Sequence, residues 1–585
     1  MNKPKTLNFK GVWIPILLGV ALSFGHSAAR FASIPLRDPA FYIQTVVYSA
    51  LCSLAFLCID VTASHYSANA VNSKHCAFGR ISGILRFDCE ESLQGVFKDA
   101  LKIIACWAPV FILLFPGAMY WDTGDQLSQF FGISAFGMPE GQIWDHHPWF
   151  STYLYGLLTK LGLSLNGSFL TGLALNAMVQ YFLAAVSFSW SFALLKRKGV
   201  ACNSVQTVAM FVCFFPVIPI MLSTMSKDVS NAVVFLFWCV LFFKLADGQL
   251  EPLRKPWFFL LFFLTTLAVS LTKKMGLYVI LAAIIALLLF HAVKTLKTIL
   301  VSVAVFVALL INAIFPLCLY PVLNIVPGGA QAAIVMPIEL LARVAKYYPN
   351  DASEEERAVI DSYLIYSWKQ MGDLYNPYIT DPVTGYNLKG EVPFSDFIKV
   401  WIRMGLRHPL TYMNAFFSLE SGWISFAGAP SVSQPCEPYP QYPLFIEPVF
   451  CSSFNQDTFG KLCEAPTSSI GQDIMSGVYD VLKVVPGANL LFYISTWTSI
   501  MPSFVLFVFV RRKGIKVSGW QVALPYWISG LSLFVYPVSL SAQRQDPTRY
   551  MFHMVLLAPL MVLIIMQWYS DQVGLHIQSE SNDIV

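Results

Sequence analysis

Charged residues are scarce in this 585-residue chain. Asp, Glu, Lys and Arg together make up 12% of it, which is about half of what a soluble protein carries. Hydrophobic residues make up 56%, and the mean hydropathy is +0.59. This composition excludes an intrinsically disordered chain and a disulfide-rich secreted module. The apolar segments also lack the alternating polarity of outer-membrane barrel strands. No CxxC or Cys/His spacing indicates a zinc site.

Long apolar runs recur along most of the chain. Each is roughly 17 to 25 residues long, enough to cross a hydrocarbon core of about 30 Å. We therefore predict an all-α polytopic membrane protein with about twelve transmembrane helices. The first run has no small-residue cleavage site and is expected to remain as an anchor. The helices are expected near residues 11–28, 41–61, 100–118, 168–195, 203–224, 229–246, 257–272, 276–292, 298–320, 489–510, 519–540 and 550–569.

Basic residues gather on alternate loops between these runs. By the positive-inside rule, those loops face the cytoplasm and the loops between them are extracytoplasmic. We therefore predict a multi-pass protein of the cell membrane, with its active site on the extracytoplasmic face. The basic clusters are Lys74, Arg80 and Arg86; Lys196, Arg197 and Lys198; Arg254 and Lys255; Lys294 and Lys297; and Arg511, Arg512, Lys513 and Lys516.

One large polar segment separates two apolar regions of the chain. The one large polar segment, 321–488, holds 17 of the 34 acidic residues and is predicted to form a mainly helical extracytoplasmic domain. Cys436, Cys451 and Cys463 lie in it, so one disulfide is plausible, and its pairing stays open. The expected parts are an N-terminal transmembrane region at 1–320 with an outer catalytic loop at about 118–167, the domain at 321–488, C-terminal transmembrane helices at 489–570 and a cytoplasmic tail at 571–585.

The first long outer loop contains a dense set of ionisable residues. Asp122 and Asp125 are three residues apart and would share one face of a helix. Such a pair can act as a base and its orienter, or hold a divalent cation. Asp145, His146 and His147 follow in the same loop and add proton acceptors or ligands. The alternative is that one aspartate caps a helix and the histidines lie in a wet interfacial loop.

Cations occupy three further outer turns. Lys227 precedes Asp228, Lys273 precedes Lys274, and Arg549 opens the last apolar run. Lysine and arginine in these positions can bind the phosphate of a lipid-linked substrate. The alternatives are a self-neutralising Lys-Asp turn, lysines that anchor helices by snorkelling, and an ordinary helix start at Arg549. If these cations bind a phosphate, Asp122, Lys227, Lys273 and Arg549 should line one cavity. The alternatives do not require this.

The order of these motifs resembles the membrane-embedded glycosyltransferases of the GT-C superfamily, and specifically an uncharacterised bacterial branch of it. The resemblance covers about residues 100 to 570. It departs in chemistry at 273–275, where the branch has an arginine and two amides and this chain has Lys273-Lys274-Met275. The matching residues are Pro116-Gly117, Asp122-Thr123, Gln126, His146-His147-Pro148, Lys227-Asp228, Gly276-Leu277-Tyr278, Pro337, Arg343, His408-Pro409, Tyr412 and Arg549-Tyr550.

The resemblance implies an inverting glycosyltransferase. It would move a sugar from a polyprenyl-phosphate carrier to an extracytoplasmic glycan, lipid or protein acceptor of the cell envelope, with membrane lipids around it and no nucleic-acid partner. Asp122 would be the general base, and Asp125 (the second catalytic residue), Asp145 or His147 would orient it or hold a metal. Some members need a divalent ion and others do not, so Mg²⁺ or Mn²⁺ stays open. The substrate-binding residues implied are Gln126, Asp145, His146, His147, Lys227, Asp228, Lys273, Lys274, Arg343 and Arg549.

Other functions fit parts of the pattern. A transporter or flippase of a lipid-linked substrate is one alternative, but its ionisable residues should lie near the bilayer midplane, whereas the apolar runs here are almost free of charge. A glycan polymerase or ligase would use the same carrier chemistry with a whole oligosaccharide. A membrane scaffold whose 321–488 domain binds a partner is the remaining alternative.

Overall fold

The computed structural model describes residues 10–72, 85–119, 121–135, 137–290, 294–385, 387–426, 470–512, 521–535 and 548–582. This part of the chain is mainly α-helical, as predicted, and its four strands are only two or three residues long. The elements up to residue 319 are α1 (Trp13–Phe31), α2 (Pro39–Asn72), α3 (Leu93–Leu113), β1 (Ala118–Met119), α4 (Trp121–Phe130), β2 (Ile143–Asp145), α5 (Trp149–Asn166), α6 (Phe169–Arg197), α7 (Cys202–Phe214), α8 (Val217–Leu222), β3 (Thr224–Met225), α9 (Lys227–Asp247), η3 (Glu251–Arg254), α10 (Pro256–Thr272), α11 (Lys274–Phe290), α12 (Lys294–Leu309) and η4 (Leu310–Leu319).

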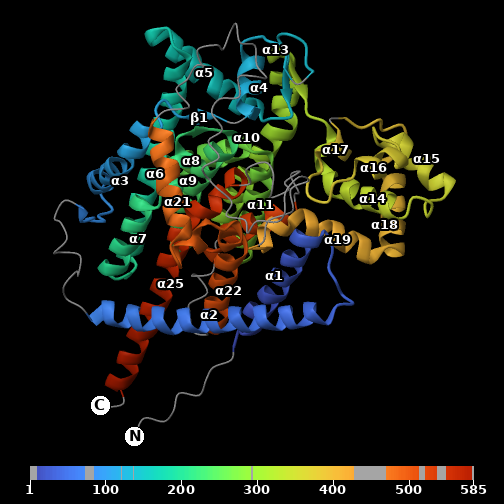
Figure 1. Ribbon diagram of the computed structural model, residues 1–585. Coiled ribbons are helices and arrows are strands. Elements are labelled where there is room, and N and C mark those ends of the chain that lie inside the picture. The colour runs from blue at the N-terminus through green and yellow to red at the C-terminus, as the bar shows by residue number, and fades with distance from the viewer. Residues whose placement is uncertain are drawn as a thin grey trace.

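The remaining elements form a side lobe and the end of the helical body. The lobe, drawn in yellow in Figure 1, is built mainly from α14 to α18. In chain order the elements are α13 (Tyr320–Leu323), β4 (Ile325–Pro327), η5 (Ala330–Ala333), α14 (Val335–Tyr347), α15 (Glu354–Tyr363), α16 (Trp368–Leu374), α17 (Asp381–Thr384), α18 (Phe394–Arg407), α19 (Pro409–Glu420), η6 (Ser421–Ile424), α21 (Ile470–Val484), η8 (Ala488–Phe492), η9 (Thr496–Ile500), α22 (Met501–Arg511), α24 (Leu524–Val535) and α25 (Thr548–Asn582).

Several helices suit a membrane. Within the described residues, six are long and apolar enough to cross one, by length and composition. The length and composition of these helices confirm the prediction of an all-α membrane protein. These six segments are Trp13–Phe31, Pro39–Tyr66, Phe169–Arg197, Lys227–Asp247, Thr295–Leu323 and Thr548–Ser570.

The structure differs from the predicted helices in three places. The run at 203–224 is broken into α7 and α8, because Pro216 has no N–H to continue the hydrogen-bond ladder. The predicted loop at 118–167 contains two helices, α4 and α5. The predicted tail at 571–585 begins as a continuation of α25, which ends at Asn582.

Helix α9 runs through the centre of the main core. It has 21 residues and is therefore about 31 Å long at roughly 1.5 Å per residue. Nearly all its side chains are buried, and it packs against α6, α10 and α25. A helix that is apolar on all sides is stable where other helices surround it. Its two ends therefore mark two polar regions separated by a continuous apolar core.

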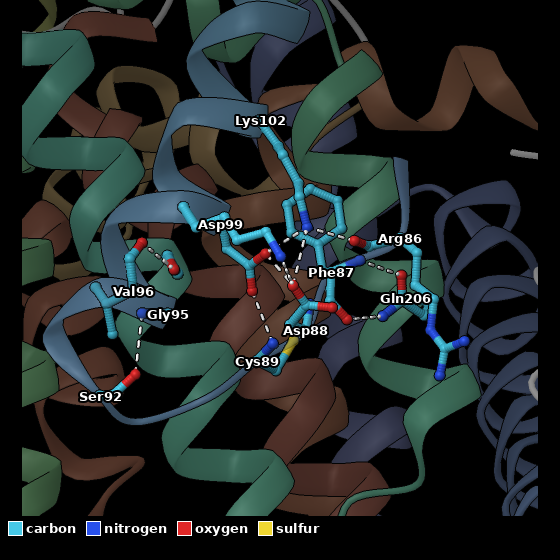
Figure 2. A network of polar contacts seen from close by, with 12 residues as sticks. Arg86, Phe87, Asp88, Cys89, Ser92, Gly95, Val96, Asp99, Lys102 and Gln206 are labelled. Atoms are coloured by element: carbon cyan, nitrogen blue, oxygen red, sulfur yellow. Dashed lines mark hydrogen bonds and ion pairs between the residues drawn. The ribbon is translucent and has the colours of Figure 1, made fainter. Parts of the chain in front are cut away.

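At the C-terminal end of α9, the loop before α3 is fixed by a polar network (Figure 2). The Asp99 side chain is only 1% exposed. Its carboxylate accepts the backbone N–H of Asp88 at 3.2 Å and of Cys89 at 2.7 Å. Lys102 Nζ lies 2.8 Å from Asp99 Oδ1. The buried charge is therefore paired and hydrogen-bonded, which is the condition under which burial is tolerated.

The same loop also binds the ends of α6, α7 and α9. Gln206 of α7 accepts the N–H of Phe87 at 3.1 Å and donates to its carbonyl at 2.7 Å, as Figure 2 shows. Glu91 pairs with Arg197 of α6 and lies 2.8 Å from Lys244 of α9. Basic residues from separate loops, which the sequence assigns to one side, thus lie together at one end of the helical body.

The side lobe has its own hydrophobic core. This core runs from Ile334 to Ala415, whereas Trp423 and Ile424 already belong to the main core. Among the described residues, this core lies within the predicted domain at 321–488. The predicted disulfide residues Cys436, Cys451 and Cys463 lie outside the described residues.

Two short strand pairs tie the outer loops to one another. β1 pairs with β3 in parallel, with Ala118 opposite Thr224. β2 pairs with β4 in parallel, with Asp145 opposite Pro327. The first pair places the start of α4 beside the start of α9, and the second brings the chain after residue 327 beside the loop that carries the histidines.

Candidate functional site

A cavity of about 560 Å³ lies where α4, α9, α11 and α25 begin. The convergence predicted for Asp122, Lys227, Lys273 and Arg549 is observed, because all four line this cavity. Four more of the predicted site residues line it as well: His146, His147, Asp228 and Lys274.

The site residues occupy the first turns of helices. Asp122 is the second residue of α4, Lys227 the first of α9, Lys274 the first of α11 and Arg549 the second of α25. The Ser226 side chain caps α9 by accepting the N–H of Asp228. Helix N-termini carry partial positive charge and unpaired N–H groups. Four such ends at one cavity add to the field of the cationic side chains and favour an anion.

Asp122 is held between two cations. Its Oδ2 lies 2.5 Å from Lys227 Nζ and 3.1 Å from Arg549 Nη1. Burial alone would raise the pKa of this carboxyl, but the charges of Arg549 and Lys227 hold it well below its usual range. In the protein without substrate, Asp122 is therefore an ion-paired carboxylate.

The two histidines are neutral near pH 7. His147 Nδ1 lies 2.6 Å from Lys227 Nζ, and burial, reinforced by the Lys227 charge, holds the His147 pKa well below its usual range. Burial also lowers the pKa of His146 to about 4, and its ring stacks on Trp144 at 4.5 Å between centroids. Because the Lys227 ammonium donates to Nδ1, the proton of neutral His147 is on Nε2. His147 thus helps to hold Lys227 beside Asp122.

Each remaining cation also has a partner that positions it. Lys273 Nζ lies 2.8 Å from Asp228 Oδ1. Lys274 Nζ lies 3.0 Å from Asp145 Oδ2, which also accepts the Tyr320 hydroxyl at 2.9 Å. Asp145 is thus placed behind the cavity lining, where it orients Lys274.

Besides Asp145, two predicted substrate-binding residues do not line the cavity. Gln126 is buried and donates to Thr152 Oγ1 at 3.0 Å, so it joins α4 to α5. Arg343 donates to the Ala32 carbonyl at 2.6 Å and so joins α14 to the end of α1. Neither residue lines the cavity, because the polar group of each is used in packing.

The residues present do not fit a divalent ion. Asp122 Oδ2, the expected ligand, already faces Lys227 and Arg549 at hydrogen-bond distance. Among the described residues, no three His, Cys, Asp or Glu side chains gather in a way that could hold a metal.

Sequence reasoning missed a second segment of the cavity lining. It comes from residues 328–387, which lie far from the predicted catalytic loop in the sequence. The parallel pairing of β2 with β4 brings this segment back to the cavity. Pro327-Gly328-Gly329 indicates a turn, but no pattern shows where that turn lies. The polar residues of this segment are Gln331, Tyr366, Asp381, Thr384 and Asn387.

Asp125, predicted as a second catalytic residue, does not line the cavity. Burial raises its pKa to about 7, the Asp122 charge adds to the rise, and Lys227 opposes it. The unfolded chain releases this proton near the ordinary value of 3.8. Between the two values the folded protein binds more protons, so the free energy of unfolding falls as the pH rises.

We expect Asp125→Asn to remove this loss. The melting temperature of the variant minus that of wild type should be larger at about pH 8 than at about pH 5. Thermal unfolding of both purified proteins at the two pH values measures the effect. The histidines are present in both proteins, so their contribution to the pH dependence of the melting temperature cancels in this difference. A difference that does not change with pH would show that Asp125 titrates normally.

Comparisons with known proteins give one match. Residues 138–433, just over half of the chain, match the profile of a family described as "Family of unknown function (DUF6020)". No curated protein and no solved structure matches the chain. The matched segment contains Lys227, Lys273 and the lining segment at 328–387, while Asp122 and Arg549 lie outside it. The chain therefore belongs to the DUF6020 family.

Proposed function

We propose that this protein is an inverting glycosyltransferase of the GT-C type, which moves a sugar from a polyprenyl-phosphate carrier to an extracytoplasmic acceptor of the cell envelope. The observation that carries the proposal is the composition of the cavity. The Asp122 carboxylate lies with Lys227, Lys273, Lys274 and Arg549 where four helices begin, and Asp228 pairs with Lys273 beside it. Transfer from a glycosyl phosphate requires a base for the acceptor and cations for the departing phosphate.

The cations of the cavity lining support an anionic leaving group. Four cations, Lys227, Lys273, Lys274 and Arg549, line the cavity together with the carboxylates of Asp122, Asp228 and Asp381. Asp145 pairs with Lys274 from behind the lining. The N-termini of the helices add positive potential. A phosphate that enters would compete with these carboxylates for the cations.

An adjoining cavity supports a lipid-linked donor. It has a volume of about 40 Å³ and shares Lys273, Met275 and Tyr550 with the main cavity. Its other lining combines Phe235, Val269, Val279 and Leu533, from α9, α10, α11 and α24, with the polar residues Asn231, Ser529, Ser532 and His553. The start of a prenyl chain attached to a phosphate near Lys273 would continue between these helices.

The resting ion pairs suggest how the base becomes active. The donor phosphate competes with Asp122 for Lys227 and Arg549, and when these cations turn to the phosphate the Asp122 pKa rises. The carboxylate then takes the proton of the acceptor hydroxyl. The acceptor oxygen forms a bond to the anomeric carbon, the bond from that carbon to the phosphate oxygen breaks, and its electron pair stays on the phosphate. Attack opposite the leaving group inverts the anomeric carbon.

We infer a topology of about twelve spans with the cavity on the extracytoplasmic side. Helix α9 begins at Lys227 in the cavity and ends near Lys244, which pairs with Glu91 in the basic region. Its length of about 31 Å matches a hydrocarbon core. By the positive-inside rule, the end with Arg86, Lys196, Arg197 and Lys198 is cytoplasmic.

Reconstitution tests the function. The purified protein in liposomes is supplied with polyprenyl-phosphate sugars and an envelope extract as acceptor, and release of polyprenyl phosphate is measured with transfer of labelled sugar. We expect both products with wild type and neither with empty liposomes. Movement of an intact sugar-lipid across the bilayer without release of the phosphate would establish the flippase alternative. Transfer of an oligosaccharide, with no transfer of a single sugar, would establish the polymerase or ligase alternative.

A further inference from the structure

Helix α18 of the side lobe carries three different rows of side chains. The first row is buried in the core of the lobe. The second is apolar but largely exposed, with Ile402 at 47% and Leu406 at 79%. The third is basic. Residues three or four positions apart share a helix face, and the rows are Phe397, Val400 and Met404; Ile398, Ile402 and Leu406; and Lys399, Arg403 and Arg407. An exposed apolar row beside a basic row is typical of a helix that lies on a membrane.

The exposed apolar side chains of the lobe gather at this helix. Among the described residues from 334 to 415, eight large apolar or aromatic side chains are exposed, and four of them lie on α18 or in the first turn of α19. These four are Phe394, Ile402, Leu406 and Leu410. Single exposed apolar side chains are ordinary, but a group of them on one side marks a contact surface. We call Ile402, Leu406 and Leu410 the α18 ridge.

The chain bends between α18 and α19. His408 has a non-helical backbone, with φ −126° and ψ 55°, and Pro409 begins α19. The Tyr412 hydroxyl donates to the carbonyl of Trp401 at 2.9 Å, across 11 positions of the sequence. In one straight helix these residues would be about 16 Å apart along the axis. Helix α18 therefore leaves α19 at an angle, and Figure 1 shows α19 between α18 and α1.

This bend lies near the end of a helix that can cross the membrane. Asn414 of α19 accepts the N–H of Ile34, just after α1, at 2.8 Å. Further along α19, the Phe417 ring lies 5.2 Å from that of Phe24 in α1. Helix α1 is long and apolar enough to span a bilayer. Because Leu410 precedes Asn414 by four residues, about 6 Å along α19, the α18 ridge begins at the level where α1 would leave the hydrocarbon core.

We propose that the α18 ridge docks on the bilayer that the protein itself spans, in the leaflet on the side of the cavity, and that Arg403 binds the phosphate of an anionic lipid there. Arginine can keep its charged end among lipid phosphates while its stem lies on apolar groups. Arg407 is already paired with Glu356 at 3.0 Å. Arg403 is exposed and makes no ion pair with a described residue. The lobe also lines part of the cavity, so docking holds that lining at the membrane surface.

Quenching by lipids tests the docking on the full-length protein, with one copy in each nanodisc. The fluorescent amino acid acridonylalanine replaces Leu406, or Glu355 as a matched control. Glu355 is exposed in the first turn of α15, which Figure 1 draws on the side of the lobe away from α1. Phospholipids brominated on their acyl chains should reduce the emission at 406 and not at 355, whereas acrylamide in the water should quench 355 more than 406. With Ile402→Ser and Leu410→Ser together, the quenching by lipid at 406 should decrease.

The lipid charge tests the part assigned to Arg403. Fluorescence lifetimes separate the quenched and unquenched populations, and their ratio is measured in neutral and in anionic nanodiscs. In anionic nanodiscs, Arg403→Gln should lower this ratio about fivefold, the usual contribution of one basic residue near an anionic surface. Lys369→Gln is the matched control, because Lys369 is an exposed cation of α16 outside the basic row. It should leave the ratio unchanged.

All the substituted side chains are exposed, so the melting temperatures of the variants should stay close to that of wild type. Equal quenching by lipid at 406 and 355 would overturn the docking. So would protection of 406 from both brominated lipid and acrylamide, because protein would then cover the ridge. If Arg403→Gln and Lys369→Gln give the same ratio, Arg403 does not bind lipid phosphate. Sugar transfer is not measured, so these results leave the proposed function standing or falling on its own test.

Discussion

Asp122→Asn is expected to reduce the rate of sugar transfer by about 10²- to 10⁴-fold, the usual contribution of a general base. The amide cannot take the proton of the acceptor hydroxyl. The same substitution removes the charge that competes for Lys227 and Arg549, whose nitrogens lie 2.5 and 3.1 Å from Asp122 Oδ2. Inorganic phosphate should therefore bind more tightly to the variant than to wild type. Initial rates in liposomes and calorimetric titration with phosphate measure the two effects.

This pair of opposite effects distinguishes a base from a structural residue. A misfolded variant would lose phosphate binding together with transfer. In cells, the envelope glycans and glycolipids are compared among wild type, a deletion strain and Asp122→Asn at equal expression. The same sugar should be missing from both altered strains. If Asp122→Asn restores the sugar fully to the deletion strain, Asp122 is not the base.

Asp60→Ala is expected to cause the largest loss of stability, about 3–5 kcal/mol, the usual result of removing one partner from a buried ion pair. The Asp60 side chain is 4% exposed. It lies 3.0 Å from Arg511 Nε and 2.9 Å from Arg512 Nη2, and accepts the Tyr569 hydroxyl at 2.8 Å. The variant would leave two largely buried guanidinium groups without their carboxylate and would loosen α2 from α22 and α25. Unfolding of the purified protein in detergent measures the loss.

Asp247→Ala is a suitable control for this prediction. Asp247 pairs with Lys198, and both side chains are about a quarter exposed. An ion pair in contact with solvent contributes only about 0–1 kcal/mol. The control should therefore melt close to wild type. Equal losses in Asp60→Ala and Asp247→Ala would mean that the three helices are held together by apolar packing alone.

The helices and the gathering of charges were the predictable part of the structure. Long apolar runs leave few choices, because their backbone groups must be satisfied inside a helix. The short loops between them then confine Asp122, Lys227, Lys273 and Arg549 to one end of the molecule. Runs of this kind do not show where a proline divides a helix in two, as Pro216 does between α7 and α8.

Two features of the site depend on long-range contacts that no local pattern contains. Arg343 resembles a phosphate-binding residue in sequence, yet its guanidinium donates to the Ala32 carbonyl, more than 300 positions away. Gln331 looks ordinary in sequence and becomes notable only because the pairing of β2 with β4 places its segment against the cavity. Helix α5 was missed because its buried face contains Gly156, Thr159 and Gly162, and small and polar residues do not produce an apolar run.

The separate core of the side lobe has an evolutionary consequence. The helices with residues Ile334 to Ala415 fold around their own apolar centre, whereas the four cations are held by the main core. Most of the cavity-lining residues between 328 and 387 belong to this lobe. Exchanging the lobe between two family members would thus alter this part of the cavity lining and leave the four cations in place. Under the proposed function, we expect a chimera of two such chains to take its choice of donor sugar from the lobe and the chemistry of transfer from the main body.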